Sequence, residues 1–213
     1  MGCGMANYEA KPCVRASLFQ LEAERIRDML ESSQLSRAEL EVALSEDELE
    51  LLDDAHKSTA LWYDAGTIDK LITLMASKSG LSLPEFCRMR GAKAAEALCK
   101  SGLYQQLEYL NRMQSAEVTD PDARSRAFRR DLRLIVTLSK NVFNFTQWSV
   151  VEDPDAPRRF QIEISEASDF SDIQANCTDG FINWAAKRRE GGRMWEWSRP
   201  TPDVVIFRML QDV

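Results

Sequence analysis

The stretch GGRMWEWSRPTPDVVIFRML, residues 191–210, decides how the end of the chain folds. RMWEWSR and DVVIFRM are typical of strands, and Pro200 and Pro202 are expected in the turn between them, where proline interrupts no ladder. Trp195 and Trp197 are two residues apart, so they share one face of a strand. We expect both to be mostly buried in an antiparallel hairpin, because large aromatic side chains on one face usually cover a core; a ligand site is the alternative.

The residues before this hairpin extend the same pattern. NFTQWSVVE is strand-like, DPDAP is a turn, and RFQIEIS alternates so that Phe160, Ile162 and Ile164 share one face. SDIQANCTDGFINWAAKRRE is typical of a helix that ends at Gly191 and Gly192. A further helix is expected from Asp120 and Pro121 to about Phe143, because a capping acid followed by proline begins helices. The order helix-β-β-helix-β-β predicts an α+β fold with a four-stranded antiparallel sheet and helices packed on it.

The first half of the chain is predicted to be helical. Ser36 with Glu39 and Ser45 with Glu48 form two capping boxes, each opening a short helix. RGAKAAEAL, with small side chains, predicts close helix packing, either within the fold or in a homodimer. The expected organisation is a disordered leader over 1–16, a helical part over 17–116 and an α+β sheet part over 117–213, packed together as one domain.

Composition limits the class of protein. The 213 residues are 44% hydrophobic, enough for a sizeable core, and no apolar run of about 18 residues predicts a membrane span. Five cysteines without a secretory signal favour reduced thiols and a cytoplasmic location. The net charge of −7 comes from residues 1–120, with 13 basic and 20 acidic side chains, and disfavours nucleic-acid binding.

Three stretches carry a resemblance to a known superfamily: ELLDDAHKSTALWYDAGTIDKLI, FCRMRGAKAAEAL and the closing sheet. The sequence resembles the ligand-binding superfamily of haem nitric-oxide sensors, TRAPP vesicle-tethering subunits and bacterial 4-vinyl-reductase domains, and is similar to uncharacterised myxobacterial proteins. The resemblance implies a fold and a function in binding ligands or protein partners. The sensors place an iron-binding histidine on the helix before the sheet, but residues 121–143 contain none, and no Tyr-x-Ser-x-Arg motif is present. We therefore expect no cofactor, and a protein that purifies colourless.

Few residues suggest catalysis or metal binding. The single histidine, His56, excludes a metal site built from several imidazoles and is best interpreted as a solvated side chain at a helix end. The eight acids of residues 39–54 lack the spacing of a calcium loop, so a solvated helix face is preferred. No catalytic residue and no metal ligand is predicted.

The function predicted from sequence is a non-enzymatic ligand-binding or adaptor module in bacterial signalling. An enzyme with an aromatic pocket and a structural subunit of an oligomer are the alternatives. A small apolar ligand or a protein is the expected partner. The candidate ligand-binding residues are Trp148, Trp195 and Trp197. The candidate partner-binding residues are Arg126, Arg129, Arg130 and Arg133, which share one helical face. The favoured interpretation of this face is that it is solvated. The alternative is binding of an acidic partner, which includes the chain's own segment 39–54.

Overall fold

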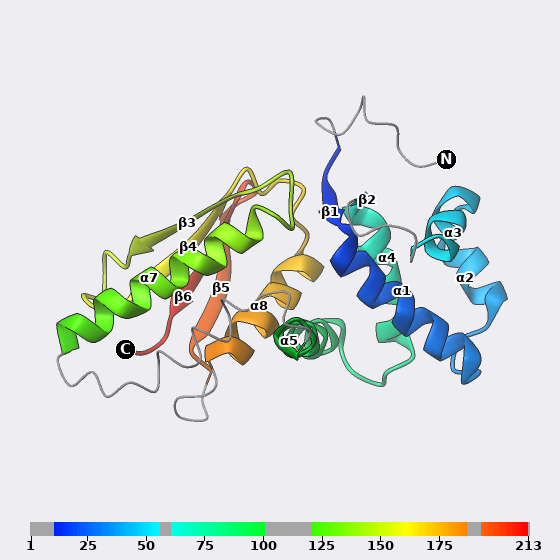
Figure 1. Cartoon of the computed structure of the whole chain (residues 1–213), viewed down its shortest axis with the longest axis horizontal. Coiled ribbons are helices and arrows are strands. Elements are labelled where there is room, and N and C mark those ends of the chain that lie inside the picture. The colour runs from blue at the N-terminus through cyan, green and yellow to red at the C-terminus, as the bar shows by residue number, and fades with distance from the viewer. Residues whose placement is uncertain (1–10, 56–60, 101–120, 187–192, 213) are drawn as a thin grey trace. The chain divides into compact units, whose positions relative to one another are not determined.

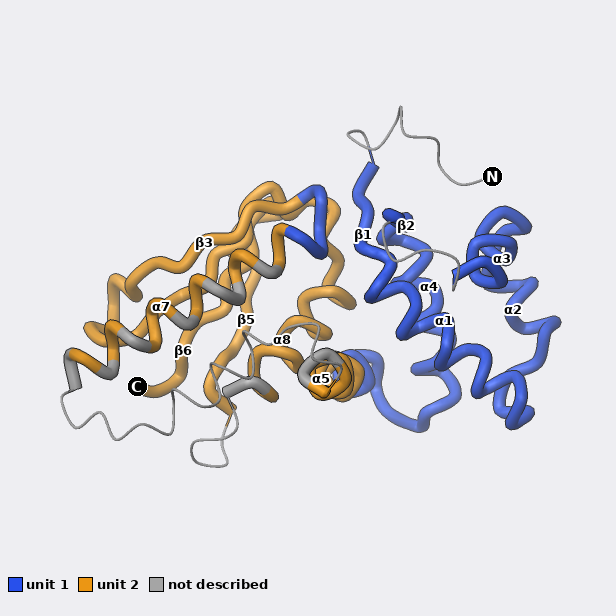
Figure 2. The backbone as a smooth tube through the Cα atoms, viewed as in Figure 1, with its two compact units in different colours: residues 1–87, 141–145 blue, residues 88–140, 146–213 orange. Residues whose placement is uncertain are grey.

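The computed structural model describes residues 11–55, 61–100, 121–186 and 193–212. Helices and antiparallel strands alternate along the chain, which confirms the α+β class (Figure 1). The described residues divide into two compact units. Unit 1 comprises residues 1–87 and 141–145, and unit 2 comprises residues 88–140 and 146–213 (Figure 2). This division differs from the predicted boundary near residue 116.

Unit 1 is mainly helical. It contains β1 (Cys13–Arg15), α1 (Ala16–Glu31), α2 (Arg37–Ala43), α3 (Glu46–Asp53), β2 (Trp62–Asp64) and α4 (Ala65–Ser77). Both predicted capping boxes are present: the Ser36 and Ser45 side chains accept from the backbone N–H groups of Glu39 and Glu48, and the glutamates reach back to the serines. In the core, Phe19 stacks on Tyr63 with ring centroids 4.1 Å apart.

The N-terminal strand β1 belongs to a small antiparallel pairing that sequence patterns missed. β1 pairs with β2, and Val14 also forms a bridge with Phe143. The backbone N–H of Arg15 donates to the Val142 carbonyl over 2.9 Å. Two predictions are corrected here. Residues 13–16 are not a disordered leader, and the helix expected to reach Phe143 ends at Ser139, because the residues that follow pair with β1.

Unit 2 contains the sheet. Helix α5 (Leu83–Lys100) belongs to unit 2 from Arg88 onward. The elements that follow are α7 (Pro121–Ser139), β3 (Gln147–Glu152), β4 (Phe160–Ser165), α8 (Asp172–Ala186), β5 (Trp195–Thr201) and β6 (Val204–Met209). The strand order is β3-β4-β6-β5, with every pair antiparallel. The predicted alternation in β4 is confirmed, since Phe160, Ile162 and Ile164 are all buried.

Helices α7 and α8 cover the same face of this sheet. Phe128 of α7 contacts Phe160 and Trp195, whose ring centroids are 6.2 Å and 6.4 Å away. Side chains of α8 reach β5 on the face that carries Trp195 and Trp197. The core of unit 2 therefore lies between this face and the two helices.

The closing hairpin differs from its prediction at one proline. Pro200 lies inside β5 and not in the turn. The pairing of β5 with β6 is irregular between Ser198 and Thr201, and β5 is an edge strand, so the missing N–H of Pro200 removes no bond from the centre of the sheet. No helix among the described residues is long and apolar enough to cross a membrane.

Candidate functional site

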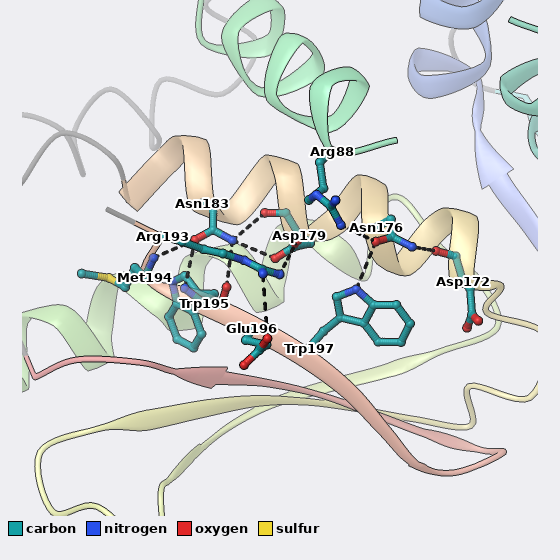
Figure 3. A network of polar contacts seen from close by, with 10 residues as sticks. All are labelled: Arg88, Asp172, Asn176, Asp179, Asn183, Arg193, Met194, Trp195, Glu196 and Trp197. Atoms are coloured by element: carbon teal, nitrogen blue, oxygen red, sulfur yellow. Dashed lines mark hydrogen bonds and ion pairs between the residues drawn. The ribbon is translucent and has the colours of Figure 1, made fainter. Parts of the chain in front are cut away.

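The polar interior of unit 2 is concentrated where α8 meets the start of β5 (Figure 3). Asn183 of α8 acts there as a strand partner for Trp195. Its Nδ2 donates to the Trp195 carbonyl over 3.1 Å, and its Oδ1 accepts from the Trp195 N–H over 2.9 Å. The Met194 N–H also donates to Oδ1 over 2.9 Å. One side chain therefore satisfies three backbone groups at the entry to an edge strand.

Asp179 lies one helical turn before Asn183 and is completely buried. Its Oδ2 accepts from the Arg193 Nη2 over 2.8 Å, and its Oδ1 accepts from the Asn183 Nδ2 over 2.8 Å. Burial raises the pKa of Asp179 above its ordinary value of 3.8, although the charges of Arg193 and Arg88 oppose that shift. Both carboxylate oxygens accept hydrogen bonds, so Asp179 links α8 to Arg193, which lies just before β5.

Asn176, one turn earlier on α8, joins two further side chains. Its Oδ1 accepts from the Arg88 Nη1 over 3.1 Å and lies 3.4 Å from the Trp197 Nε1. Figure 3 shows Arg88 and Trp197 reaching Asn176 from different elements, α5 and β5. Asn176 is buried, whereas Arg88 and Trp197 are half-buried. The three residues form the part of the network that is partly open to solvent.

Two glycines bring α5 against α8 and so position Arg88. A Cβ on Gly180 would lie 1.9 Å from the Arg88 carbonyl oxygen, and a Cβ on Gly91 would lie 1.8 Å from the Cys177 carbonyl oxygen. Only glycine permits backbones to approach this closely. The close packing predicted for RGAKAAEAL is thus found inside unit 2, where Ala95 is also buried. The homodimer stays a prediction.

The three candidate tryptophans do not converge. Trp148 is buried on β3, where its Nε1 donates to the Thr146 hydroxyl over 2.9 Å and its ring meets Phe170 edge-on. Trp195 is 1% exposed and belongs to the core, as expected. Trp197 was expected to be mostly buried as well, but it is half-buried. Both tryptophans lie on β5, and Phe128 of α7 covers Trp195. Among them, Trp197 alone combines partial exposure with polar neighbours.

Sequence reasoning missed the residues of the polar network between α8 and β5. They are Arg88, Asn176, Asp179, Asn183 and Arg193. A signal for three of them was present, because Asn176, Asp179 and Asn183 recur at i, i+3 and i+7 and therefore share one face of α8. Polar residues on a helix face that covers a sheet need partners in the interior.

The arginine face of α7 is only partly solvated. Arg126, Arg130 and Arg133 are exposed, but the Arg129 Nη1 lies 2.8 Å from the Glu152 Oε1 of β3. In the acidic segment 39–54, Glu48 pairs with Lys70 over 2.8 Å, and Glu39 pairs with Lys78. Both lysines belong to unit 1, as the segment does. Binding of an acidic partner by the arginines stays a prediction.

The side chains do not provide the donor set that a haem centre of the resembling sensors requires. The chain has one histidine, His56, which lies outside the described residues, and α7 has none. On the face of the sheet beneath α7, the space is filled by Phe128 packed between Phe160 and Trp195. Within the described ranges, no three His, Cys, Asp or Glu side chains gather as a metal site. We therefore derive no chemistry through haem.

Comparison with known proteins supports the fold. No protein-family model and no curated protein matches the sequence. Among solved structures, the chain is similar to an Fe(II) unliganded H-NOX protein mutant from K. algicida, with a TM-score of 0.56 and 11% sequence identity. The match covers 92% of this chain and 95% of that one. At this identity the likeness concerns the fold alone, and the predicted similarity to TRAPP subunits and myxobacterial proteins is not supported. The chain therefore shares its fold with an H-NOX protein over nearly its full length.

Proposed function

We propose that this protein is a non-enzymatic ligand-binding module of a signalling system that recognises its ligand without haem. The observation that supports the proposal most is the full-length likeness to an H-NOX protein, since 92% of the chain follows that fold. A fold is not a function, so the choice rests also on the site. Half-buried Trp197 and Arg88 beside buried Asn176 offer a ligand an aromatic surface and hydrogen-bond donors.

The haem-independent part of the proposal rests on the side chains available. A sensor with the same fold and without an imidazole on α7 needs another way to hold its ligand. The proposal that the module is not an enzyme rests on Asp179. The carboxylate with a raised pKa is the group that a search for catalysis would select. It is completely buried and saturated by Arg193 and Asn183, so it fits a structural role better.

Native mass spectrometry of the purified full chain tests the proposal together with an absorption spectrum. We expect a small organic ligand to co-purify and to raise the melting temperature when added back, because a ligand that binds the folded state stabilises it by mass action. We expect no Soret band after expression with added haem. A Soret band would contradict the haem-independent reading. A chain that co-purifies with no ligand, and that a panel of small metabolites does not stabilise, would contradict the sensor function.

A further inference from the structure

Among the described residues around α8 and β5, Arg193 and Arg199 each face a carboxylate, whereas Arg88 does not. Arg193 has the Asp179 carboxylate at 2.8 Å and the Glu196 carboxylate at 3.9 Å. Arg199 has the Asp172 carboxylate at 3.2 Å. Arg88, among the residues that the structure describes, has a single hydrogen bond, to the neutral Asn176 Oδ1, and no carboxylate within ion-pair distance. Arg88 is therefore the guanidinium of this network whose charge lacks a direct counter-ion.

This arrangement leaves donors of Arg88 available to another acceptor. A guanidinium carries five N–H donors, and the hydrogen bond to Asn176 uses one of them. The backbone of Arg88 is held close to Gly180, and the residue as a whole is half-buried, so part of it stays open to solvent. An incoming anion would supply the acceptors that the protein does not.

The neighbour of Arg88 indicates what the rest of such an anion would contact. Arg88 Nη1 and Trp197 Nε1 lie 3.1 Å and 3.4 Å from the same oxygen, so the guanidinium and the indole are adjacent. The indole is half-buried and offers an apolar surface next to the charge. The positive charge of Arg88 acts to lower the pKa of the buried Asp179, so the two groups interact electrostatically. A single cation whose charge is already partly offset by a buried carboxylate suits a monoanion better than a phosphate, which carries about −1.5 to −2 charges.

We propose that Arg88 binds the carboxylate of a small organic acid whose apolar or aromatic body packs on the Trp197 ring. This inference deepens the proposed sensor function, and it rests on that function for its biological meaning. Arg88 supplies a bidentate pair to the carboxylate, as planar guanidinium groups do. Asn176 accepts from both Arg88 and Trp197 and so keeps the two side chains adjacent. Gly180 lets the backbone of Arg88 lie against α8.

The test uses the full-length protein with benzoate as the probe, and with benzamide and inorganic phosphate as controls for charge and for the type of anion. Binding is followed by calorimetry and by tryptophan fluorescence. Wild type should bind benzoate at millimolar concentration and should prefer it to both controls. Arg88→Met should weaken benzoate binding roughly tenfold or more, since charge-assisted hydrogen bonds contribute on that scale. Arg88→Lys should restore part of it, and Arg133→Met, which removes an exposed charge on α7, should change nothing.

Several outcomes would overturn the inference. One is benzoate binding that is unchanged in a folded Arg88→Met protein, another is a preference for phosphate, and a third is no benzoate binding by wild type. If Arg88→Met itself unfolds, the Trp197→Leu variant carries the test, because loss of the indole should weaken benzoate but not phosphate. Native mass spectrometry separates this inference from the proposed function. A co-purified ligand that Arg88→Met still binds would be consistent with the proposed sensor function and would contradict the carboxylate site at Arg88. Absence of any ligand from wild type would reject the sensor while the benzoate titration still tested the subsite.

Discussion

The two units use carboxylates in opposite ways. In unit 1, Glu39 and Glu48 lie at helix starts near the surface. The hydrogen bond from Lys78, with those from Ser36, lowers the pKa of Glu39 to about 2. For Glu48, partial burial pushes the pKa upward, but hydrogen bonds from Lys70, Ser45 and Thr67 outweigh it, and the pKa is about 2. In unit 2, burial dominates, and the pKa of Asp179 is raised despite its ion pair with Arg193.

The difference shows that a partner does not by itself make a charge stabilising. At Glu39 and Glu48 the hydrogen-bond donors outweigh whatever hydration the carboxylate has lost, whereas at the completely buried Asp179 the loss of hydration outweighs the donors. The surface groups of unit 1 therefore contribute to the stability of helix starts. We propose that the buried Asp179 fixes how α8 and β5 pack and lowers the free energy of unfolding in doing so. Four experiments test this difference between the two units.

The largest effect is expected at the core of unit 2. Trp195→Ala should lower the free energy of unfolding by about 3–5 kcal/mol, because the side chain is 1% exposed and packs on Phe128. Trp197→Ala should cost only about 1–2 kcal/mol, because the indole is half-buried. Urea titrations of both variants measure the difference. Equal losses would show that Trp197 belongs to the core and would weaken its assignment to a ligand.

The next effect concerns the helix contact that positions the site. Gly180→Ala places a Cβ 1.9 Å from the Arg88 carbonyl oxygen, where backbone has to move. We expect a loss of about 1–3 kcal/mol or more in the free energy of unfolding, together with weaker ligand binding. Gly66→Ala in unit 1 is the matched control, since its Cβ would meet only the flexible end of the Asp64 side chain at 3.0 Å. A well-folded Gly180→Ala protein with an unchanged melting temperature would refute the close contact.

The pH dependence of stability tests the comparison directly. Glu48 has a folded pKa of about 2, below its ordinary 4.5, so its contribution is present above pH 4.5 and is lost as the pH falls towards 2. Asp179 has a raised folded pKa, so its contribution is present below pH 3.8 and is lost as the pH rises through that raised pKa.

Two conservative variants separate these contributions. Glu48→Gln should cost about 1 kcal/mol at neutral pH and little in strong acid. Asp179→Asn should be neutral or slightly stabilising at neutral pH and should gain nothing in acid, because it removes a buried charge. Urea titrations across the acid range follow both variants. A marked loss of stability for Asp179→Asn at neutral pH would show that the ion pair with Arg193 outweighs burial.

The smallest effect on stability is expected on α7. The double variant Arg129→Glu with Arg130→Glu breaks the exposed ion pair of Arg129 with Glu152, and exposed pairs contribute about 0–1 kcal/mol. The melting temperature should change little. Salt-sensitive capture of an acidic partner, if α7 binds one, should disappear, because several arginines act together and salt screens them. Arg25→Glu with Arg27→Glu on α1 reverses the same charge elsewhere, and equal capture by both variants would leave the arginine face as a solvated surface.

Local patterns in the sequence determined much of the fold. Alternation in Phe160, Ile162 and Ile164 predicted β4 and its buried face, and the two serine–glutamate boxes predicted the starts of α2 and α3. Both signals depend on neighbours within a few residues. The order helix-β-β-helix-β-β and the antiparallel hairpin follow from the same kind of information, because short connections join adjacent strands.

Tertiary structure decided what local patterns could not. β1 is a strand because it pairs with β2 and also forms a bridge with Phe143, both distant in the sequence. Pro200 is tolerated in β5 because that strand lies at the edge of the sheet. The candidate site was also out of reach of the sequence. Arg88 and Trp197 are 109 positions apart, and they meet at Asn176 because Gly91 and Gly180 let two helix backbones touch. Periodicity reports which face of an element is buried; which residues from other elements meet there depends on how the elements pack.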